Sequence, residues 1–229
     1  TVSPELTEIF KQRYTLRMPH EFLYNACPLK PKIKKSKKIH HLYTIPEHKK
    51  IILCQGGVTP GRGLEDFIDA AAHLPHEDVS LVFLGSGNKN YINNLKQKAQ
   101  NQNTQIYIGK HVSSEQLPEY TACANIGLLP NRGAGINNTM GAPNRLFEYI
   151  QARIPILAYA HQGVQTVLEQ AQTGWLLAWN NPKELSQTIL DKLEEAHHIA
   201  PEKYDLAAQS FSWEQEEDKY LSLVQNLLE

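Results

Sequence analysis

The stretch GAPNRLFEYIQARIPILAY, residues 141–159, carries the clearest structural signal in this sequence. Pro143 fits the first position of a helix, where its missing N–H costs nothing. Ile154, Ile156 and Leu157 follow that helix and predict a strand buried on both faces, as in a parallel sheet. A loop, a short helix and a buried strand in this order are typical of an α/β fold.

The start of this helix is a candidate anion site. Gly141 and Ala142 are small enough to let a ligand approach the backbone. The amides of Asn144, Arg145 and Leu146 would have no acceptor within the helix. The helix dipole favours an anion at this end, and the forked guanidinium of Arg145 suits a phosphate.

Glu148 lies one helical turn after Asn144, and its side chain leans back toward the start of the helix. A carboxylate there could accept hydrogen bonds from two sugar hydroxyls beside a bound phosphate. The alternative is an ordinary capped helix on which Glu148 is merely solvated.

The run NRLFEY followed by IPILAY resembles the donor-binding region of retaining glycosyltransferases with the GT-B fold, in the bacterial group 1 family that builds surface polysaccharides. In that family a Glu-x7-Glu motif closes on the nucleotide-sugar, and the second Glu holds the ribose hydroxyls. Glu148 matches the second position, whereas Met140 stands at the first. The polar neighbours Asn137, Asn138 and Thr139 could replace the missing carboxylate.

Composition indicates a soluble globular protein: of 229 residues, 41% are hydrophobic and 21% are charged. A net charge of −1 argues against general nucleic-acid binding, which needs a broad basic surface. No run approaches the length of a membrane span, and the N-terminus lacks a signal-peptide pattern. Cys27, Cys54 and Cys123 are odd in number and widely spaced, so we expect reduced thiols in a cytoplasmic protein.

Residues 1–48 do not resemble the start of a domain. Ser3 and Pro4 predict the cap of a helix, and EFLYNACP, residues 21–28, predicts a short strand and turn. The latter is similar to the exit from the first domain of these transferases. We therefore expect the chain to begin near the end of an absent N-terminal domain.

The basic run KPKIKKSKKIHH, residues 30–41, predicts a solvated linker. The alternative is a patch that contacts an anionic membrane surface. His40 and His41 have no further ligands nearby in the sequence and do not predict a metal site.

A regular alternation of strands and helices begins near residue 49. It predicts a doubly wound, Rossmann-like, six-stranded parallel sheet over residues 49–210, which the resemblance identifies as the donor-binding domain. The expected strands are KKIILCQ, VSLVFLG, TQIYIGK, ANIGLLP, IPILAY and GWLLAW. Two helices, at about 201–210 and 212–228, close the chain, and residues 211–229 resemble the family's terminal crossing helix.

In such sheets ligands bind beyond the carboxyl ends of the strands, where the strand order switches. The loop QGGVTPGRG, residues 55–63, has this position. The family pattern here is Gly-Arg and then Lys-Gly: Gly56, Arg62 and Gly63 match it with Arg for Lys, while Gly57 stands where the family often has Arg. Arg62 is our candidate for the diphosphate, and the alternative is an exposed surface arginine.

Two other loops have the same position. IYIGKHV, residues 106–112, resembles the family strand whose exit bonds the nucleobase, which implies contacts from Gly109 and Lys110. The loop of residues 131–143 leads into the helix described first.

Other nucleotide chemistries lack their motifs. LGSGNKN, residues 84–90, begins like a dinucleotide fingerprint, but Asn90 stands where the third glycine belongs. There is no Walker motif, no Asp-x-Asp pair and no His or Cys cluster with ligand spacing in the sequence. These absences agree with metal-independent transfer that needs no cofactor.

The sequence thus predicts the C-terminal, donor-binding half of a retaining GT-B glycosyltransferase. We expect it to help transfer a hexose from a UDP-sugar such as UDP-glucose to a polysaccharide or glycolipid, and to be inactive without its other half. Arg62 would stabilise the leaving diphosphate and Glu148 would hold the ribose. The further expected substrate contacts are Gly56, Gly57, Gly109, Lys110, Thr139, Met140, Gly141, Ala142, Asn144, Arg145 and Leu146.

The expected partners are the UDP-sugar, a saccharide or lipid-linked saccharide acceptor, and the missing N-terminal domain. The expected location is the cytoplasm, with possible peripheral contact to the inner face of the membrane. Two alternatives stay open: a UDP-sugar epimerase of the same architecture, and a non-catalytic module that binds nucleotide-sugars.

Overall fold

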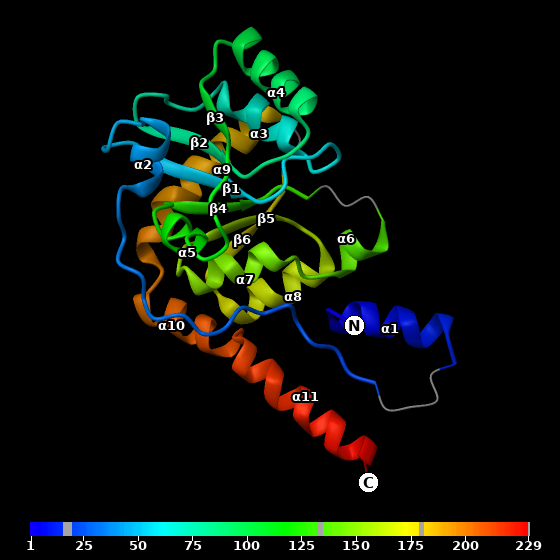
Figure 1. Cartoon of the computed structure of the whole chain (residues 1–229). Helices are drawn as coiled ribbons and strands as arrows, with labels where there is room; N and C mark the ends of the chain where they lie inside the picture. Colours follow the sequence, from blue (N-terminus) through cyan, green and yellow to red (C-terminus); the bar gives the residue numbers. More distant parts are fainter. Residues whose placement is uncertain (16–19, 132–134, 179–180, 229) are drawn as a thin grey trace.

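The structure is a computed structural model that describes residues 1–15, 20–131, 135–178 and 181–228 (Figure 1). The strands are β1 (Lys50–Gln55), β2 (Val79–Leu84), β3 (Ile106–Lys110), β4 (Ile126–Leu129), β5 (Ile156–Tyr159) and β6 (Gly174–Leu177). The helices that pack on them are α2 (Lys38–Tyr43), α3 (Leu64–Ala71), α4 (Lys89–Asn101), α5 (Leu117–Thr121), α7 (Asn144–Gln151), α8 (Gln162–Ala171), α9 (Pro182–Glu195) and α10 (Pro201–Ser210). The remaining elements are α1 (Pro4–Arg13), α6 (Ile136–Met140), the 3-10 helix η1 (Ala196–His198) and α11 (Trp213–Leu228).

All pairings among the described strands are parallel, and the strand order is β3-β2-β1-β4-β5-β6. The prediction of a six-stranded parallel sheet is therefore confirmed. The order runs outward in both directions from β1 and β4, so the switch point lies between these two strands.

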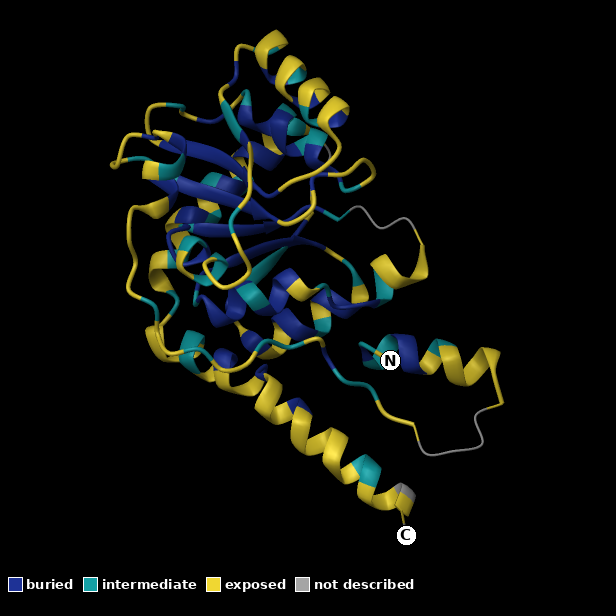
Figure 2. Ribbon diagram, viewed as in Figure 1, coloured by how far each residue is buried: buried dark blue, intermediate teal, exposed yellow. Residues whose placement is uncertain are grey.

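Helices cover both faces of the sheet because successive strand residues point to opposite sides. Ile51 and Leu53 of β1 join the core under α2, α5, α7, α8 and α10. Ile52 and Cys54 join the core under α3, α4 and α9. Figure 2 shows the central strands almost entirely buried, while β3 and β6 are only partly buried and the helices expose their outer faces.

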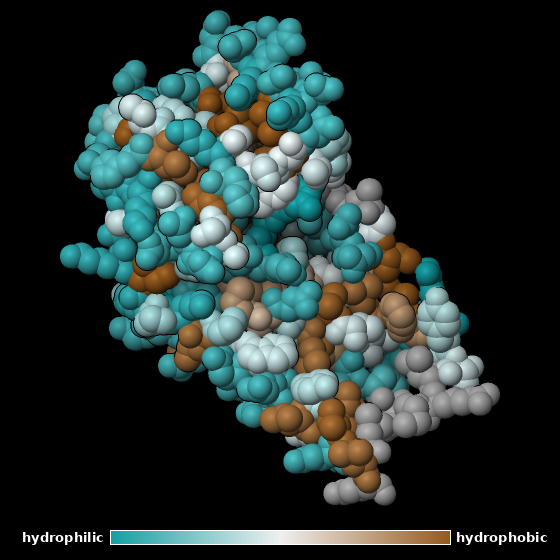
Figure 3. All heavy atoms as spheres, in the orientation of Figure 1, coloured by the Kyte–Doolittle hydropathy of each residue, from teal (hydrophilic) through white to brown (hydrophobic). Residues whose placement is uncertain are grey.

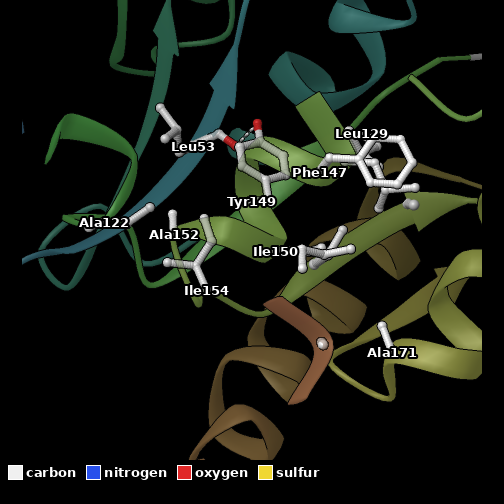
Figure 4. Packing of buried hydrophobic residues seen from close by; sticks show 14 of the residues in the cluster. Leu53, Ala122, Leu129, Phe147, Tyr149, Ile150, Ala152, Ile154 and Ala171 are labelled. Atoms are coloured by element: carbon white, nitrogen blue, oxygen red, sulfur yellow. Dashed lines mark hydrogen bonds between the residues drawn. The ribbon is translucent and has the colours of Figure 1, made fainter. Parts of the chain in front are cut away.

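The hydroxyl of Tyr149 on α7 fills the switch point. β1 pairs with β4 only through Ile52↔Ile126 and Leu53↔Gly127. Beyond these pairs the Tyr149 hydroxyl accepts a hydrogen bond from the backbone amide of Gln55 (3.1 Å). It also lies 3.2 Å from the carbonyl oxygens of Leu53 and Leu128 and can donate to either. One side chain thus satisfies backbone groups of both strands, and Figure 4 shows its contact with Leu53 of β1.

Two features make room for this side chain and keep it protonated. A Cβ at Gly127 would lie 2.7 Å from Cδ2 of the Tyr149 ring, so the ring can lie against β4 only because residue 127 is glycine. Complete burial raises the pKa of Tyr149 well above 10, so its hydroxyl remains a hydrogen-bond donor at neutral pH.

The segment 21–28 is not the strand that we expected. It pairs with no strand among the described residues, and carboxylates of α11 bond one amide of this segment and the amide that directly follows it. The Tyr24 amide donates to Glu216 (2.9 Å) and the Leu29 amide donates to Glu214 (2.9 Å). Side-chain acceptors from a distant part of the chain therefore replace the hydrogen bonds to a neighbouring strand that sequence propensity alone had suggested.

Two local predictions also need correction. The basic run is not a solvated linker throughout, because its end belongs to α2, which buries Ile39 and Tyr43 in the core. The expected loop 131–143 contains the short helix α6.

Helix α11 extends away from the body of the protein (Figure 1) and exposes large apolar side chains, including Tyr220, Leu221 and Leu228. Figure 3 shows apolar residues gathered over its far end. None of the described helices is long and apolar enough to cross a membrane.

We predict that Tyr149→Phe lowers the free energy of unfolding by about 1–3 kcal/mol, because it leaves the buried backbone amide of Gln55 without an acceptor. Urea unfolding followed by circular dichroism measures the change. Tyr220→Phe, at a position that is 47% exposed, is the matched control. Equal stability of Tyr149→Phe and the wild type would show that this hydroxyl does not hold the switch point together.

Candidate functional site

Two arginines meet at the carboxyl end of β1. The turn after β1 passes through Gly56, whose φ of 102° favours glycine. A Cβ at Gly56 would lie 3.9 Å from Cζ of Arg145, and a Cβ at Gly57 would lie 3.9 Å from Cζ of Arg62. The absence of side chains at these two positions therefore leaves the space beside both guanidinium groups.

The charge of this arginine pair is not balanced by nearby protein groups. Within the described ranges, no carboxylate forms an ion pair with either guanidinium. The acceptor found for Arg145 is the thiol of Cys54, at 3.7 Å from Nη1. Burial raises the pKa of this thiol, so it stays neutral and does not compensate the charge.

Partial burial and the nearby charge of Arg145 lower the pKa of Arg62. Arg145 itself is 8% exposed, which places its charge in a region of low dielectric. Two cations that repel each other at the edge of a core are stabilised by an anion between or beside them. Arg62 is half-buried rather than fully exposed.

The start of α7 differs in detail from the prediction. Pro143 is the N-cap rather than the first helical residue, and its carbonyl accepts from the Leu146 amide at 2.8 Å. The Leu146 amide is therefore engaged, which removes it from the expected anion contacts. The amides of Asn144 and Arg145 remain at the helix start, next to the arginine pair.

Glu148 is held by a buried relay rather than being merely solvated. The Thr121 hydroxyl donates to Gln55 Oε1 (2.7 Å), and Gln55 Nε2 donates to Glu148 Oε2 (2.5 Å). Gln55 is only 1% exposed, so its amide is fixed in place. The relay occupies one carboxylate oxygen and leaves Glu148 partly exposed for a ligand.

A cavity of about 460 Å³ lies beyond the carboxyl ends of β1, β2 and β3. It is lined by Gly56, Gly57, Leu84, Gly85, Ser86, His111, Val112 and Leu117. Its position agrees with the expectation that a ligand binds at the exit of β3, because His111 and Val112 directly follow this strand.

The hydrogen-bonding groups of Lys110, an expected contact, are engaged within the protein. The Lys110 amide donates to the Tyr43 hydroxyl (3.3 Å), its carbonyl accepts from Gly85 (2.8 Å), and its ammonium bonds the Leu42 carbonyl. Gly109, with φ of 94°, turns the chain so that His111 and Val112 line the cavity. The sequence signal that could have found them is this glycine at the strand end.

A second cavity, of about 410 Å³, lies at the loop before α7. It is lined by Val2, Asn25, Asn131, Asn137, Asn138, Gly141, Ala142, Pro143 and Asn144. Asn25 and Asn144 bond each other at 3.3 Å. Five amide side chains thus meet in one hollow, which suits the hydroxyls of an uncharged ligand.

Thr139 and Met140 do not line this cavity, contrary to expectation. The Thr139 hydroxyl donates to the Ile136 carbonyl (3.2 Å), and the Met140 carbonyl accepts from the Ser3 hydroxyl (2.6 Å). Asn137 and Asn138 are therefore the neighbours of position 140 that reach the hollow. Asn25 could not have been found from the loop, because it lies more than a hundred positions earlier in the sequence.

The site brings together an anion-binding pair, a held carboxylate and two cavities. Arg145 lies beside Gly56, which lines the first cavity, and directly follows Asn144, which lines the second. In the described part of the chain, no group of three or more His, Cys, Asp or Glu residues could hold a metal ion. The arrangement therefore has the parts needed to bind a phosphate flanked by two uncharged groups.

Residues 35–210 match the family model described as glycosyl transferases group 1. A search of curated protein sequences found no match. Among solved structures, sucrose-phosphate synthase from Thermosynechococcus elongatus is similar over 100% of this chain and 57% of its own, with 20% identity and a TM-score of 0.77.

Two further structures share the fold. Anabaena HepE in complex with UDP has 17% identity and a TM-score of 0.69, over 90% of this chain and 57% of its own. The C-terminal domain of the Francisella tularensis group 1 protein LpcC has 17% identity and a TM-score of 0.60, over 79% of this chain and 95% of its own.

The chain thus spans a little over half the length of the first two structures and nearly all of an isolated C-terminal domain. The prediction of a GT-B glycosyltransferase fold is confirmed. The chain belongs to the glycosyl transferases group 1 family.

Proposed function

We propose that this chain binds the nucleotide-sugar donor of a retaining glycosyltransferase that transfers a hexose from a UDP-sugar, with UDP-glucose as the favoured donor. The observation that carries the proposal is the uncompensated pair of Arg62 and Arg145 at the carboxyl end of β1. HepE has been crystallised with UDP and with UDP-glucose, which supports a uridine nucleotide as the ligand class.

The diphosphate would lie on the two guanidinium groups and the amides at the start of α7. Both guanidiniums present several N–H donors, and their low-dielectric setting strengthens each charge-assisted hydrogen bond. As the bond to the sugar breaks, negative charge grows on the departing diphosphate. Cations fixed in advance at this position stabilise that charge without reorganising.

The two cavities take the remaining parts of the donor. The nucleobase would enter the cavity beside His111 and Val112, where backbone groups follow β3. The ribose hydroxyls would donate to Glu148, and the hexose would lie among the asparagines before α7. These amides would replace the carboxylate that the family carries at the position of Met140.

Two parts of the proposal rest on the family resemblance: the retaining outcome and an acceptor that is a growing polysaccharide or glycolipid. The acceptor would enter from an N-terminal domain. The exposed apolar side chains of α11 are the surface that such a domain would cover. The cytoplasm, with contact to the membrane surface, stays our expected location.

We predict that Arg62→Gln and Arg145→Gln each weaken UDP binding about tenfold or more, the loss expected for hydrogen bonds to a charged group. Uridine, which lacks the diphosphate, should lose little. Isothermal titration calorimetry compares the two ligands, with Arg13→Gln on the exposed end of α1 as the control. Equal losses for UDP and uridine would contradict a diphosphate role.

Glu148→Ala should weaken UDP binding by about 1.5–3 kcal/mol and 2′-deoxy-UDP binding by less, because one hydroxyl partner is already missing. Gln55→Met should shift UDP affinity in the same direction, since it frees the carboxylate from its relay. Glu169→Ala, on the exposed face of α8, is the control. Unchanged UDP affinity in a folded Glu148→Ala protein would remove Glu148 from the site.

UDP-glucose should bind this chain in the presence of EDTA, because arginine rather than a divalent cation would neutralise the diphosphate. The chain alone should not transfer glucose to an acceptor, because orientation of both substrates contributes several kcal/mol to such a reaction. A thermal-shift titration and a transfer assay test these expectations. Binding that requires added Mg²⁺ or Mn²⁺, or efficient transfer by these 229 residues, would overturn them.

A further inference from the structure

A third cavity, of about 700 Å³, lies at the amino ends of the strands. Lys50 begins β1 and Pro155 immediately precedes β5, and both line this cavity. The arginine pair lies at the carboxyl end of β1, on the opposite side of the sheet along the strand direction. A ligand in this cavity would therefore be separate from the nucleotide-sugar.

Four cationic side chains from distant parts of the chain line the cavity: Lys32, Lys35, Lys50 and Arg153. Lys50 pairs with Glu194 (2.5 Å), and Arg153 pairs with Asp205 (2.5 Å). Lys32 and Lys35 form no ion pair with any carboxylate that the structure describes. The cavity thus holds two more cations than its neighbouring carboxylates balance.

The pKa values of the neighbouring carboxyl groups are lowered mainly by the cations that pair with them. The hydrogen bond from Arg153 lowers the pKa of Asp205, and the charge of Lys32 adds to the effect. The hydrogen bond from Lys50 lowers the pKa of Glu194, with a further contribution from His197. Partial burial lowers the pKa of Lys35, as expected for an ammonium group beside a low-dielectric wall.

Lys32 and Lys35 belong to the segment of residues 30–35, which we call the strap. The strap is fixed near the amino ends of the strands. The Lys30 amide donates to Gln151 Oε1 (3.0 Å), and the Lys30 carbonyl accepts from Arg153 Nη2 (3.1 Å). Gln151 is buried and also donates to the Ala208 carbonyl (2.7 Å). These bonds bring the two lysines to the cavity before any ligand arrives.

The rest of the cavity wall is mostly apolar, with contributions from Pro155, Leu193 and Tyr204. Burial raises the pKa of Tyr204 to about 12, so its ring carries no charge at neutral pH. The combination of an apolar wall with a few converging charges is typical of small-molecule sites. A low-dielectric wall also focuses the field of the cations and raises the local concentration of anions.

We propose that this cavity is a second ligand site, which binds a phosphate monoester attached to an apolar body. A phosphate monoester carries a charge of about −1.5 to −2 at neutral pH, which matches the two unbalanced lysines. The apolar body lies against Tyr204, Leu193 and Pro155. The same chemistry occurs in soluble phosphorylated metabolites and in lipid phosphates, so the test separates these two sources.

Phenyl phosphate is the probe for the soluble source, titrated into the protein by calorimetry in saturating UDP. We expect one site, and we expect Lys32→Gln/Lys35→Gln to weaken it at least tenfold. Lys34→Gln/Lys89→Gln removes the same charge from exposed positions that do not line the cavity and should leave binding unchanged. Tyr204→Ala should weaken phenyl phosphate more than inorganic phosphate.

Vesicles test the lipid source. Vesicles of phosphatidic acid are compared with vesicles of phosphatidylglycerol at equal surface charge, for the wild type and the same two double variants. A preference for phosphatidic acid that depends on Lys32 and Lys35 assigns the site to a lipid phosphate. Binding of phenyl phosphate without that preference assigns it to a soluble ligand.

The proposal is overturned if neither probe binds through Lys32 and Lys35, or if saturating UDP abolishes phenyl phosphate binding. UDP affinity itself should be the same in Lys32→Gln/Lys35→Gln and the wild type. This comparison keeps the two proposed sites distinguishable, because each can fail while the other holds.

Discussion

This structure depends on how backbone groups are satisfied at the point where β1 and β4 diverge. β1 and β4 are neighbouring parallel strands from which the strand order runs outward in opposite directions. Backbone groups are left unpaired where the two strands diverge, and such groups are costly when buried. The Tyr149 hydroxyl bonds to both strands at this point, and Gly127 leaves the space for its ring. Because Tyr149 belongs to α7, the same contact sets the position of the helix that carries Arg145 and Glu148.

Positive charge is unbalanced at both ends of the strands, for different physical reasons. At the carboxyl ends, Arg145 is buried beside a neutral thiol, and Arg62 approaches from the glycine-rich turn. At the amino ends, lysines on an otherwise exposed strap are brought to an apolar hollow by bonds to Gln151 and Arg153. The first arrangement is part of the core, whereas the second is added to it by a segment outside the sheet.

Where sequence reasoning failed, a distant partner replaced a local preference. Segment 21–28 has the composition of a strand, yet carboxylates of α11 bond the amides of Tyr24 and of Leu29, which directly follows the segment. Lys110 ends a strand that points toward the site, yet Tyr43 and Gly85 already bond its backbone. The Leu146 amide is a local exception, because it donates to the carbonyl of Pro143, the N-cap of the same helix.

Alternating apolar runs and glycine-rich turns were sufficient to predict the parallel sheet and its six strands. These features follow from local periodicity and from the handedness of strand–helix–strand connections. The pairing of Arg62 with Arg145, the relay from Thr121 through Gln55 to Glu148, and the lysine-lined cavity depended on tertiary structure. Each joins residues that are distant in the sequence, and only the packing of helices on the sheet sets the distance between them.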